Sequence, residues 1–355
     1  MGAISGTDRI RRLTSFSHGA GCGCKLGPDE LERVMSSLAL PGLAPDVLVG
    51  ADTGDDAAVV HLRDGRALIA TLDFFTPIVD DPYDWGRIAA TNALSDVYAM
   101  GGTPFLALNI VSWPVDDLPL EMLGRVLQGG VDVVTAAGAA VLGGHTITDP
   151  EPKYGMVALG FADADRIVRN SSATAGATLF LTKPLGLGIA STAIKRGRAS
   201  PEQVAAAVEL MTTPNAVAAE AMLEAGVEAA TDVTGFGLLG HLHRMLAASG
   251  LAARVDASAV RLLPGTMDLA RADVVPGGTR RNLAYVRPHV DWGELTEPEQ
   301  IVLTDAQTSG GLLIATADPG ALERALAGRG VPAMRIGRTE TGPAGRIALE
   351  GRVTE

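Results

Sequence analysis

The chain has 355 residues, 47% of them hydrophobic, and a formal net charge of −12 from 29 basic and 41 acidic side chains. This length and apolar content predict a soluble globular protein with two domains. The acidic balance and the lack of a long basic run argue against stable nucleic-acid binding. No apolar run reaches the roughly 18 residues that a membrane-spanning helix needs. Two cysteines, close together, fit a reducing compartment, so we expect a cytoplasmic protein.

The segment 18–25 (His-Gly-Ala-Gly-Cys-Gly-Cys-Lys) combines both cysteines, three glycines and one of the four lysines of the chain. Glycines let a backbone approach a ligand closely, so the segment predicts a ligand-contacting loop. An ammonium such as that of Lys25 can sit on a phosphate as a point charge, and it lowers the pKa of a neighbouring thiol. A disulfide between Cys22 and Cys24 would close a small, strained ring. A zinc site is disfavoured because too few soft ligands are near. A Walker A loop is excluded because Leu26 stands in place of its Ser or Thr.

The first half of the chain predicts helices and strands with acidic residues at strand ends. Asp55 and Asp56 precede the first of two strands in a hairpin, and Asp73 ends the second. Asn92 and Asp96 lie four residues apart on one helical face, where they can share a metal or a ligand. The predicted helices are 28–40, 84–100 and 118–139, and the predicted strands are 57–62, 67–72, 104–111 and 154–161.

A Gly-Gly-His sequence at 143–145 predicts a turn after a short strand, which would offer amide donors and an imidazole. The polar segment 169–176 is the most plausible domain boundary. Beyond it we expect a strand at 177–182, helices to about 225 with a break near Pro214, and later a helix at 320–327 with strands at 312–315 and 347–349. Hairpins mixed with helices indicate α/β and α+β layers.

The segment 231–241 contains a dinucleotide-binding pattern, with Gly235, Gly237 and Gly240 spaced as G-x-G-x-x-G and Asp256 at the end of a strand-like run. This pattern makes a dinucleotide oxidoreductase an alternative. Against it, the stretch before Gly235 is too short and polar to predict the strong strand that the fingerprint requires.

Taken together, these motifs resemble the selenophosphate synthetases (selenide, water dikinases), within the superfamily of aminoimidazole ribonucleotide synthetase. The resemblance covers nearly the whole chain, and the cysteine loop separates this family from its superfamily relatives. The matching segments are 17–25 (SHGAGCGCK), 55–59 (DDAAV), 71–75 (TLDFF), 92–96 (NALSD), 143–145 (GGH), 231–241 (TDVTGFGLLGH) and 307–311 (QTSGG).

The resemblance implies a transferase that converts ATP, selenide and water into selenophosphate, AMP and orthophosphate. It implies a glycine-rich catalytic segment at 1–27, an N-terminal α/β domain at 28–168 that binds ATP and Mg²⁺, and a C-terminal α+β domain at 169–355. The N-terminal strands are expected to pair across a homodimer, and a selenium-delivery protein is a further expected partner.

Residue by residue, the resemblance assigns catalysis to Cys22 and Lys25, and magnesium binding to Asp56, Asp96 and Asp232. Clustered carboxylates cannot face a triphosphate directly, and they need bridging magnesium ions, which prefer oxygen ligands. The nucleotide contacts implied by the resemblance are Lys25, Thr53, Gly54, Asp55, Asp73, Asp96, Gly144, His145 and Thr146.

Several alternatives stay open at this point. A superfamily relative would be an ADP-forming kinase or synthetase, and a non-catalytic thiol carrier would load selenium or sulfur without nucleotide turnover. The role of Cys22 can be selenium relay, nucleophile or loop positioning, and Cys24 is not assigned. Ala306 stands where the family usually has proline, which affects the rigidity of a local turn but no proposed ligand.

Overall fold

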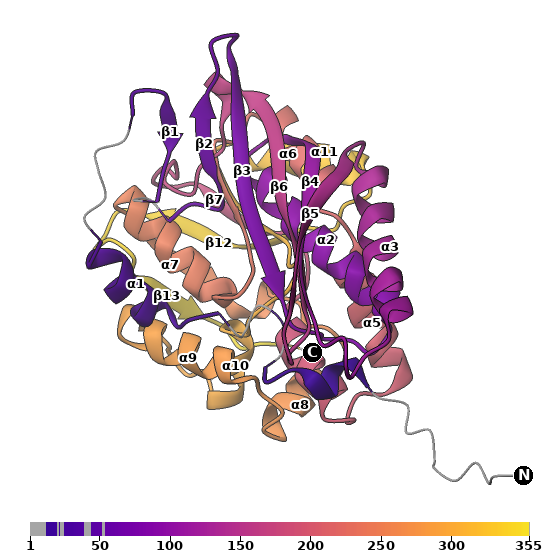
Figure 1. Ribbon diagram of the computed structural model, residues 1–355. Coiled ribbons are helices and arrows are strands. Elements are labelled where there is room, and N and C mark those ends of the chain that lie inside the picture. Colours follow the sequence, from indigo (N-terminus) through magenta and orange to yellow (C-terminus); the bar gives the residue numbers. More distant parts are fainter. Residues whose placement is uncertain (1–11, 20, 22–24, 39–43, 52–53, 355) are drawn as a thin grey trace, which may run out of the picture.

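The computed structural model describes residues 12–19, 21, 25–38, 44–51 and 54–354. Within these residues the chain forms two β-sheets, each accompanied by helices (Figure 1). The N-terminal sheet has the strand order β1-β2-β3-β6-β4-β5. Its strands are β1 (Val47–Val49), β2 (Ala58–His61), β3 (Arg66–Phe75), β4 (Thr103–Trp113), β5 (Ala140–Thr148) and β6 (Lys153–Asp163).

The predicted hairpin is confirmed, because β2 and β3 pair antiparallel with Ala58 opposite Ala70. Along β3, buried and exposed residues alternate. The side chain of Asp73 therefore lies on the same buried face as Ile69, whereas Leu72 and Phe74 face outward. Asp73 is inside the strand, two residues before its end, and not at the strand end as predicted.

Helix α2 (Pro82–Ala99) is almost entirely buried and lies against both the sheet and α3 (Leu120–Ala136). Its N-terminus is well defined, since the carboxylate of Asp81 accepts hydrogen bonds from the backbone of Tyr83 and Asp84. A helix buried on every side brings its polar residues into the interior as well, and this places Asn92 and Asp96 there.

The C-terminal half forms a mixed sheet with the strand order β10-β13-β9-β12-β7-β11-β8. Helices α4 (Leu187–Lys195), α5 (Pro201–Thr212) and α6 (Ala216–Glu224) are separated by turns at residues 196–200 and at the predicted break near Pro214. The strands are β7 (Thr178–Leu181), β8 (Ala229–Asp232), β9 (Ala252–Asp256), β10 (Val290–Asp291), β11 (Leu312–Thr316), β12 (Met334–Glu340) and β13 (Ile347–Glu350). The remaining helices are α1 (Pro28–Ser36), α7 (Gly237–Ser249), α8 (Thr266–Arg271), α9 (Gly277–Val286), α10 (Glu297–Leu303) and α11 (Pro319–Gly328).

Of three apolar clusters among the described residues, the two larger ones correspond roughly to the two sheets. Ile69, Trp85 and Met156 are fully buried in the first, and Leu238 and Ile336 are fully buried in the second. The first core also takes in apolar residues of α5 and α6 from the second half of the chain, so the two halves share buried surface. The expectation of mixed α/β and α+β layers is confirmed.

Three local predictions are wrong. Helix α1 ends at Ser36 rather than near residue 40, and α3 ends at Ala136 because Gly138, at φ +75°, turns the chain into β5. The Gly-Gly-His sequence is not a turn: it lies within β5, where His145 pairs in register with Ile110 of β4. Among the described residues, no helix is long and apolar enough to cross a membrane.

The dinucleotide pattern is excluded by topology, although the reason differs from the predicted one. A fully buried strand, β8, does lead into α7, and β9 does end at Asp256. However, β11, β7 and β12 lie between β8 and β9 in the sheet. A dinucleotide-binding βαβ unit places its two parallel strands close together around the phosphate, so this segment does not form one.

Candidate active site

Three carboxylates from distant parts of the sequence meet in the interior. Asp56 precedes β2, Asp96 lies near the end of α2, and Asp232 ends β8. One ligand oxygen from each lies within 4.8 Å of the other two. The structure therefore brings together the three residues that were predicted to bind magnesium, and two of them, Asp96 and Asp232, are buried.

Each of these carboxylates accepts a hydrogen bond from one neighbouring hydroxyl, but oxygens remain unsatisfied. Oδ2 of Asp56 and Oδ2 of Asp232 are buried and have no hydrogen-bond partner among the described residues. Buried carboxylate oxygens without donors are destabilising unless a cation satisfies them. The hydroxyl–carboxylate pairs are Thr231–Asp56 at 2.6 Å, Thr71–Asp96 and Ser95–Asp232.

Burial raises the pKa of all three carboxyls, and the charges of neighbouring aspartates add to it. For Asp56 and Asp96, burial raises the pKa well above the usual value, and the negative charge of Asp232 raises it further. Burial also raises the pKa of Asp232 to about 6, although the hydrogen bond from Ser95 opposes this. Three hard oxygen ligands with unsatisfied lone pairs fit a divalent cation such as Mg²⁺.

Asp73 lies beside this cluster and is held on both oxygens. Lys25 forms an ion pair with Oδ1 at 2.7 Å, and the side-chain amide of Asn92 donates to Oδ2 at 2.8 Å. The carbonyl oxygen of the same Asn92 amide accepts a hydrogen bond from the backbone N–H of Ser309 at 2.7 Å. Asn92 thus ties Asp73, in the N-terminal sheet, to the segment 307–311 of the C-terminal half.

Close packing positions the segment 307–311 and the N-terminal loop. Ser309 has the left-handed φ of 53°, which is uncommon for a residue other than glycine. Gly21 has φ +59°, and a Cβ there would come within 2.5 Å of the Thr308 side chain. Only glycine therefore lets the loop lie against Thr308 in this way.

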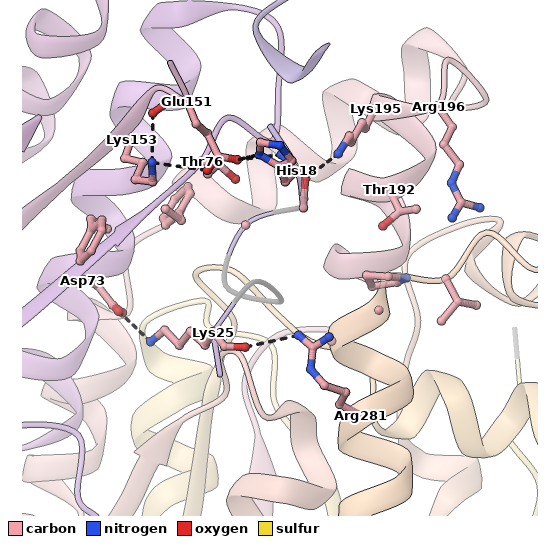
Figure 2. A pocket seen from close by; sticks show the side chains of 18 of the residues that line it. His18, Lys25, Asp73, Thr76, Glu151, Lys153, Thr192, Lys195, Arg196 and Arg281 are labelled. Atoms are coloured by element: carbon pink, nitrogen blue, oxygen red, sulfur yellow. Dashed lines mark hydrogen bonds and ion pairs between the residues drawn. The ribbon is translucent and has the colours of Figure 1, made fainter. Parts of the chain in front are cut away.

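The site opens into a cavity of about 720 Å³ between the two halves of the chain, and Figure 2 shows its wall. The described lining comes from the N-terminal loop, the end of β3, the start of β6, the end of α4 and the start of α9. Five cationic side chains line it against two carboxylates, in a protein of net charge −12, so the cavity suits an anionic ligand. The cations are Lys25, Lys153, Lys195, Arg196 and Arg281, and the carboxylates are Asp73 and Glu151.

All four lysines of the chain lie at this site. Lys25, Lys153 and Lys195 line the cavity. The ammonium of Lys183 is buried and donates to the backbone carbonyls of Thr213, at 2.6 Å, and Ser309, at 2.8 Å. Burial lowers the pKa of Lys183 to about 7, although the charge of Asp232 opposes this. The rarity of lysine in this chain points to Lys25 in the sequence, and it applies equally to the other three lysines.

Other predicted site residues lie elsewhere. Asp55 is outside the cluster, because its carboxylate accepts hydrogen bonds from the backbone N–H groups of Asp56 and Asn170. Gly144, His145 and Thr146 are exposed in β5 and are not among the residues that line the cavity. Gly54 is exposed in the segment before β2. Cys22, Cys24 and Thr53 lie outside the described residues.

Ala306, where proline is usual, is buried, and its backbone N–H donates to Oγ1 of Thr279 at 3.0 Å. The same hydroxyl donates to the buried carboxylate of Asp305 at 2.8 Å. Proline has no N–H to donate. The hydrogen bond to Thr279 therefore anchors the turn in place of the rigidity that proline would supply.

Comparison with known proteins identifies two family models in the chain. The N-terminal domain of AIR synthase related proteins matches residues 54–162, and the C-terminal domain of the same proteins matches residues 174–350. Together these models cover most of the chain, and residues 163–173 lie between them.

Two curated relatives are similar over nearly their whole length. The chain is 48% identical to the selenide, water dikinase of Myxococcus xanthus (strain DK1622) over 96% of this chain and 97% of that protein. It is 46% identical to the selenide, water dikinase of Cronobacter sakazakii (strain ATCC BAA-894) over 98% of this chain and 100% of that protein. Among solved structures, thiamine-monophosphate kinase from Stenotrophomonas maltophilia K279a has a TM-score of 0.64 at 21% identity, covering 92% of this chain and 96% of that one. This last likeness concerns the fold alone.

Proposed function

The chain belongs to the AIR synthase related family and, within it, to the selenide, water dikinases, and we propose from this that it makes selenophosphate from ATP, selenide and water, with release of AMP and orthophosphate. The observation that carries this proposal is the carboxylate cluster of Asp56, Asp96 and Asp232, next to the Lys25–Asp73 ion pair and a cation-rich cavity.

Electrostatics explains why such a cluster suits a triphosphate substrate. Three carboxylates would repel the phosphates of ATP, so their convergence is useful only around divalent cations. Asp56, Asp96 and Asp232 would hold Mg²⁺, and the unsatisfied buried oxygens of Asp56 and Asp232 support this. Bound Mg²⁺ would neutralise the phosphate charge and position the phosphoryl groups for in-line attack.

Lys25 and Cys22 act on different atoms in this proposal. The ammonium of Lys25 offers a point charge to phosphate oxygens, and its ion pair with Asp73 holds it at the edge of the cluster. A thiolate is a soft nucleophile that phosphate oxygens repel, so Cys22 is assigned to selenium. Selenide itself is a good nucleophile, and the task left to the protein is to align it with the activated phosphorus.

We also assign this protein to a homodimer in the cytoplasm. The outer face of the N-terminal sheet exposes apolar side chains, and β5 is an edge strand whose residues are nearly all exposed. Pairing of this face would bury the apolar side chains and place Gly144–Thr146 at the interface. A selenium-delivery protein remains an expected partner. The exposed apolar residues are Val60, Leu72, Phe74, Leu142 and Ile147.

Phosphorus NMR tests the proposal directly. With ATP, Mg²⁺ and selenide under anaerobic reducing conditions, we expect selenophosphate, AMP and orthophosphate in equal amounts, and no selenophosphate when selenide is omitted. Accumulation of ADP as the final nucleotide would favour an ADP-forming relative. Loading of selenium without nucleotide turnover would favour a thiol carrier.

A further inference from the structure

The cavity has a second set of donors, at the start of α9 and the end of α4, apart from the Lys25–Asp73 pair. We call it the α9 end of the cavity and define it by Thr192, Arg196, Gly277, Gly278 and Arg281. Figure 2 shows Thr192 and Arg196 on one side of the cavity and Asp73 on the other. The α9 end therefore presents its donors across the cavity from the carboxylate side.

The first turn of α9 points unsatisfied donors at this end. Pro276 is the N-cap and has no side-chain cap, and the first turn contains no acidic residue. Within the described part of the chain, the backbone N–H groups of Gly277 and Gly278 have no acceptor. A helix N-terminus carries partial positive charge and normally attracts an anion or an acidic side chain. No acidic side chain of the described residues caps this N-terminus.

An independent observation comes from Thr192. Its side chain is 5% exposed, it lines the cavity, and its hydroxyl has no hydrogen-bond partner in the described structure. A buried hydroxyl without a partner is destabilising, and one that lines a cavity can gain a partner from a ligand bound there. Figure 2 shows this side chain directed toward the cavity.

Two guanidinium groups add charge at the same end. Arg196 donates to the backbone carbonyl of Asp273 at 3.1 Å and contacts no carboxylate of the described residues. Nη1 of Arg281 lies 3.5 Å from the position that a Cβ on Gly277 would occupy, so this guanidinium sits beside the first turn of α9. Arg281 also donates to the backbone carbonyl of Lys25 at 3.3 Å, and both guanidinium groups add positive charge beside a helix N-terminus, where an anion is favoured.

The donors decide which kind of anion fits. Backbone N–H groups, a hydroxyl and guanidinium forks match the hard oxygens of a tetrahedral oxyanion. Selenide is a soft anion without oxygen acceptors, so it gains little from these donors. Phosphates of ATP would be held at the other side, where the carboxylates can bind bridging cations.

We propose that the α9 end binds a tetrahedral phosphoryl product of the reaction, orthophosphate or selenophosphate. This inference rests on the proposed function, in which two phosphoryl groups leave ATP and one is transferred to selenium while the other is transferred to water. Two tetrahedral products then form in one cavity, and only one can remain at the cation-bridged carboxylates. The α9 end gives the other a separate position.

Titration of the full-length protein with inorganic phosphate, in EDTA and without ATP or selenide, tests this inference. EDTA removes the cations that phosphate needs at the carboxylate cluster, so the binding observed by calorimetry reports the α9 end. We expect saturable binding that Thr192→Val weakens about fivefold, through one lost hydrogen bond. Arg196→Gln should weaken it at least about tenfold, because a charged donor is lost.

Two matched variants serve as controls. Ser191→Ala removes a buried hydroxyl, also without a partner in the described structure, that does not line the cavity. Arg198→Gln removes an exposed guanidinium two residues after Arg196, likewise outside the lining. Both should bind phosphate as the parent does, and thermal unfolding of all four variants identifies any loss of folding.

Thiophosphate, a stable analogue of selenophosphate, distinguishes the two products. Tighter binding of thiophosphate than of phosphate assigns the α9 end to selenophosphate, and the reverse assigns it to orthophosphate. The inference is overturned if folded parent protein shows no saturable phosphate binding in EDTA, or if Thr192→Val and Arg196→Gln bind like the parent. Because the titration contains no ATP or selenide, its failure leaves selenophosphate synthesis to be decided separately by phosphorus NMR.

Discussion

Replacement of Asp232 by asparagine should stabilise the metal-free protein and weaken its response to magnesium. Asp232 lies within 4.8 Å of ligand oxygens of both Asp56 and Asp96. Two unit charges at that distance repel by about 3 kcal/mol at an effective dielectric constant of about 20. Separately, burial and the charge of Asp73 raise the pKa of the Asp232 carboxyl from 3.8 to about 6, which corresponds to about 3 kcal/mol.

The pH dependence follows from the direction of this shift. A carboxyl with a higher pKa in the folded chain than in the unfolded chain binds protons preferentially when folded. Without a cation, the free energy of unfolding of the parent should therefore fall as pH rises from about 4 to about 6, and remain low above that range. Asp232→Asn should lose much of this dependence.

Thermal unfolding at pH 8 measures the effect. In EDTA, we expect Asp232→Asn to melt several degrees above the parent, since about 1 kcal/mol shifts Tm by about 2–4 °C in a domain of comparable size. Added Mg²⁺ should raise the Tm of the parent much more than that of the variant. Asp305→Asn is the matched control: this buried carboxylate accepts hydrogen bonds from the backbone of Gly188 and Ile189 and lies outside the cluster, so its loss should lower Tm equally with and without Mg²⁺.

The reasoning is refuted if Asp232→Asn melts at or below the parent in EDTA, or if Mg²⁺ raises the Tm of both proteins equally. Either result would mean that the buried negative charge of Asp232 is not the main source of instability in the cluster without a cation.

Four further substitutions test other parts of the site. Lys25→Ala should lower kcat by about 10²–10³, because a preorganised cation beside the phosphates is lost. Cys22→Ser should bind ATP and Mg²⁺ like the parent but lose selenophosphate formation. Calorimetry with product analysis distinguishes the two variants, and parental turnover in Cys22→Ser would remove that thiol from the mechanism. Asn92→Ala leaves one buried oxygen of Asp73 without its donor and the backbone N–H of Ser309 without its acceptor, so it should lower both kcat and Tm, which steady-state kinetics and calorimetric melting measure; an unchanged kcat would show that the tie to residues 307–311 is not needed. Lys183→Met leaves two backbone carbonyls without a donor and should lower the free energy of unfolding by about 2–4 kcal/mol in denaturant titration; an unchanged midpoint would contradict that role.

Local sequence signals predicted the order of most helices and strands, because apolar periodicity and caps depend on neighbouring residues. The segment before Gly235 shows the limit of these local signals. A short buried strand, β8, was not recognised since four residues carry little periodicity, and its separation from β9 by three strands is a property of the whole sheet. Gly143 and Gly144 predict a turn, but pairing with β4 holds this segment in an extended conformation.

Only part of the site was predicted, because contacts between distant elements leave no local pattern in the sequence. Resemblance located Asp56, Asp96 and Asp232, and the fold brings them together. The hydroxyls that donate hydrogen bonds to these carboxylates are placed by contacts between elements, which no local pattern reveals. The same holds for the buried ammonium of Lys183. Rarity was the available signal for the lysines, since all four of the chain gather at one site.

The metal role of the cluster is the central claim, and Mn²⁺ in place of Mg²⁺ tests it most directly. With a non-hydrolysable ATP analogue, electron–nuclear double resonance of bound Mn²⁺ should show coupling to nucleotide ³¹P. We expect this signal to persist in the control Asp64→Asn, which changes an exposed carboxylate, and to be lost in Asp56→Asn and Asp96→Asn. An undiminished ³¹P coupling in both cluster variants would contradict the account.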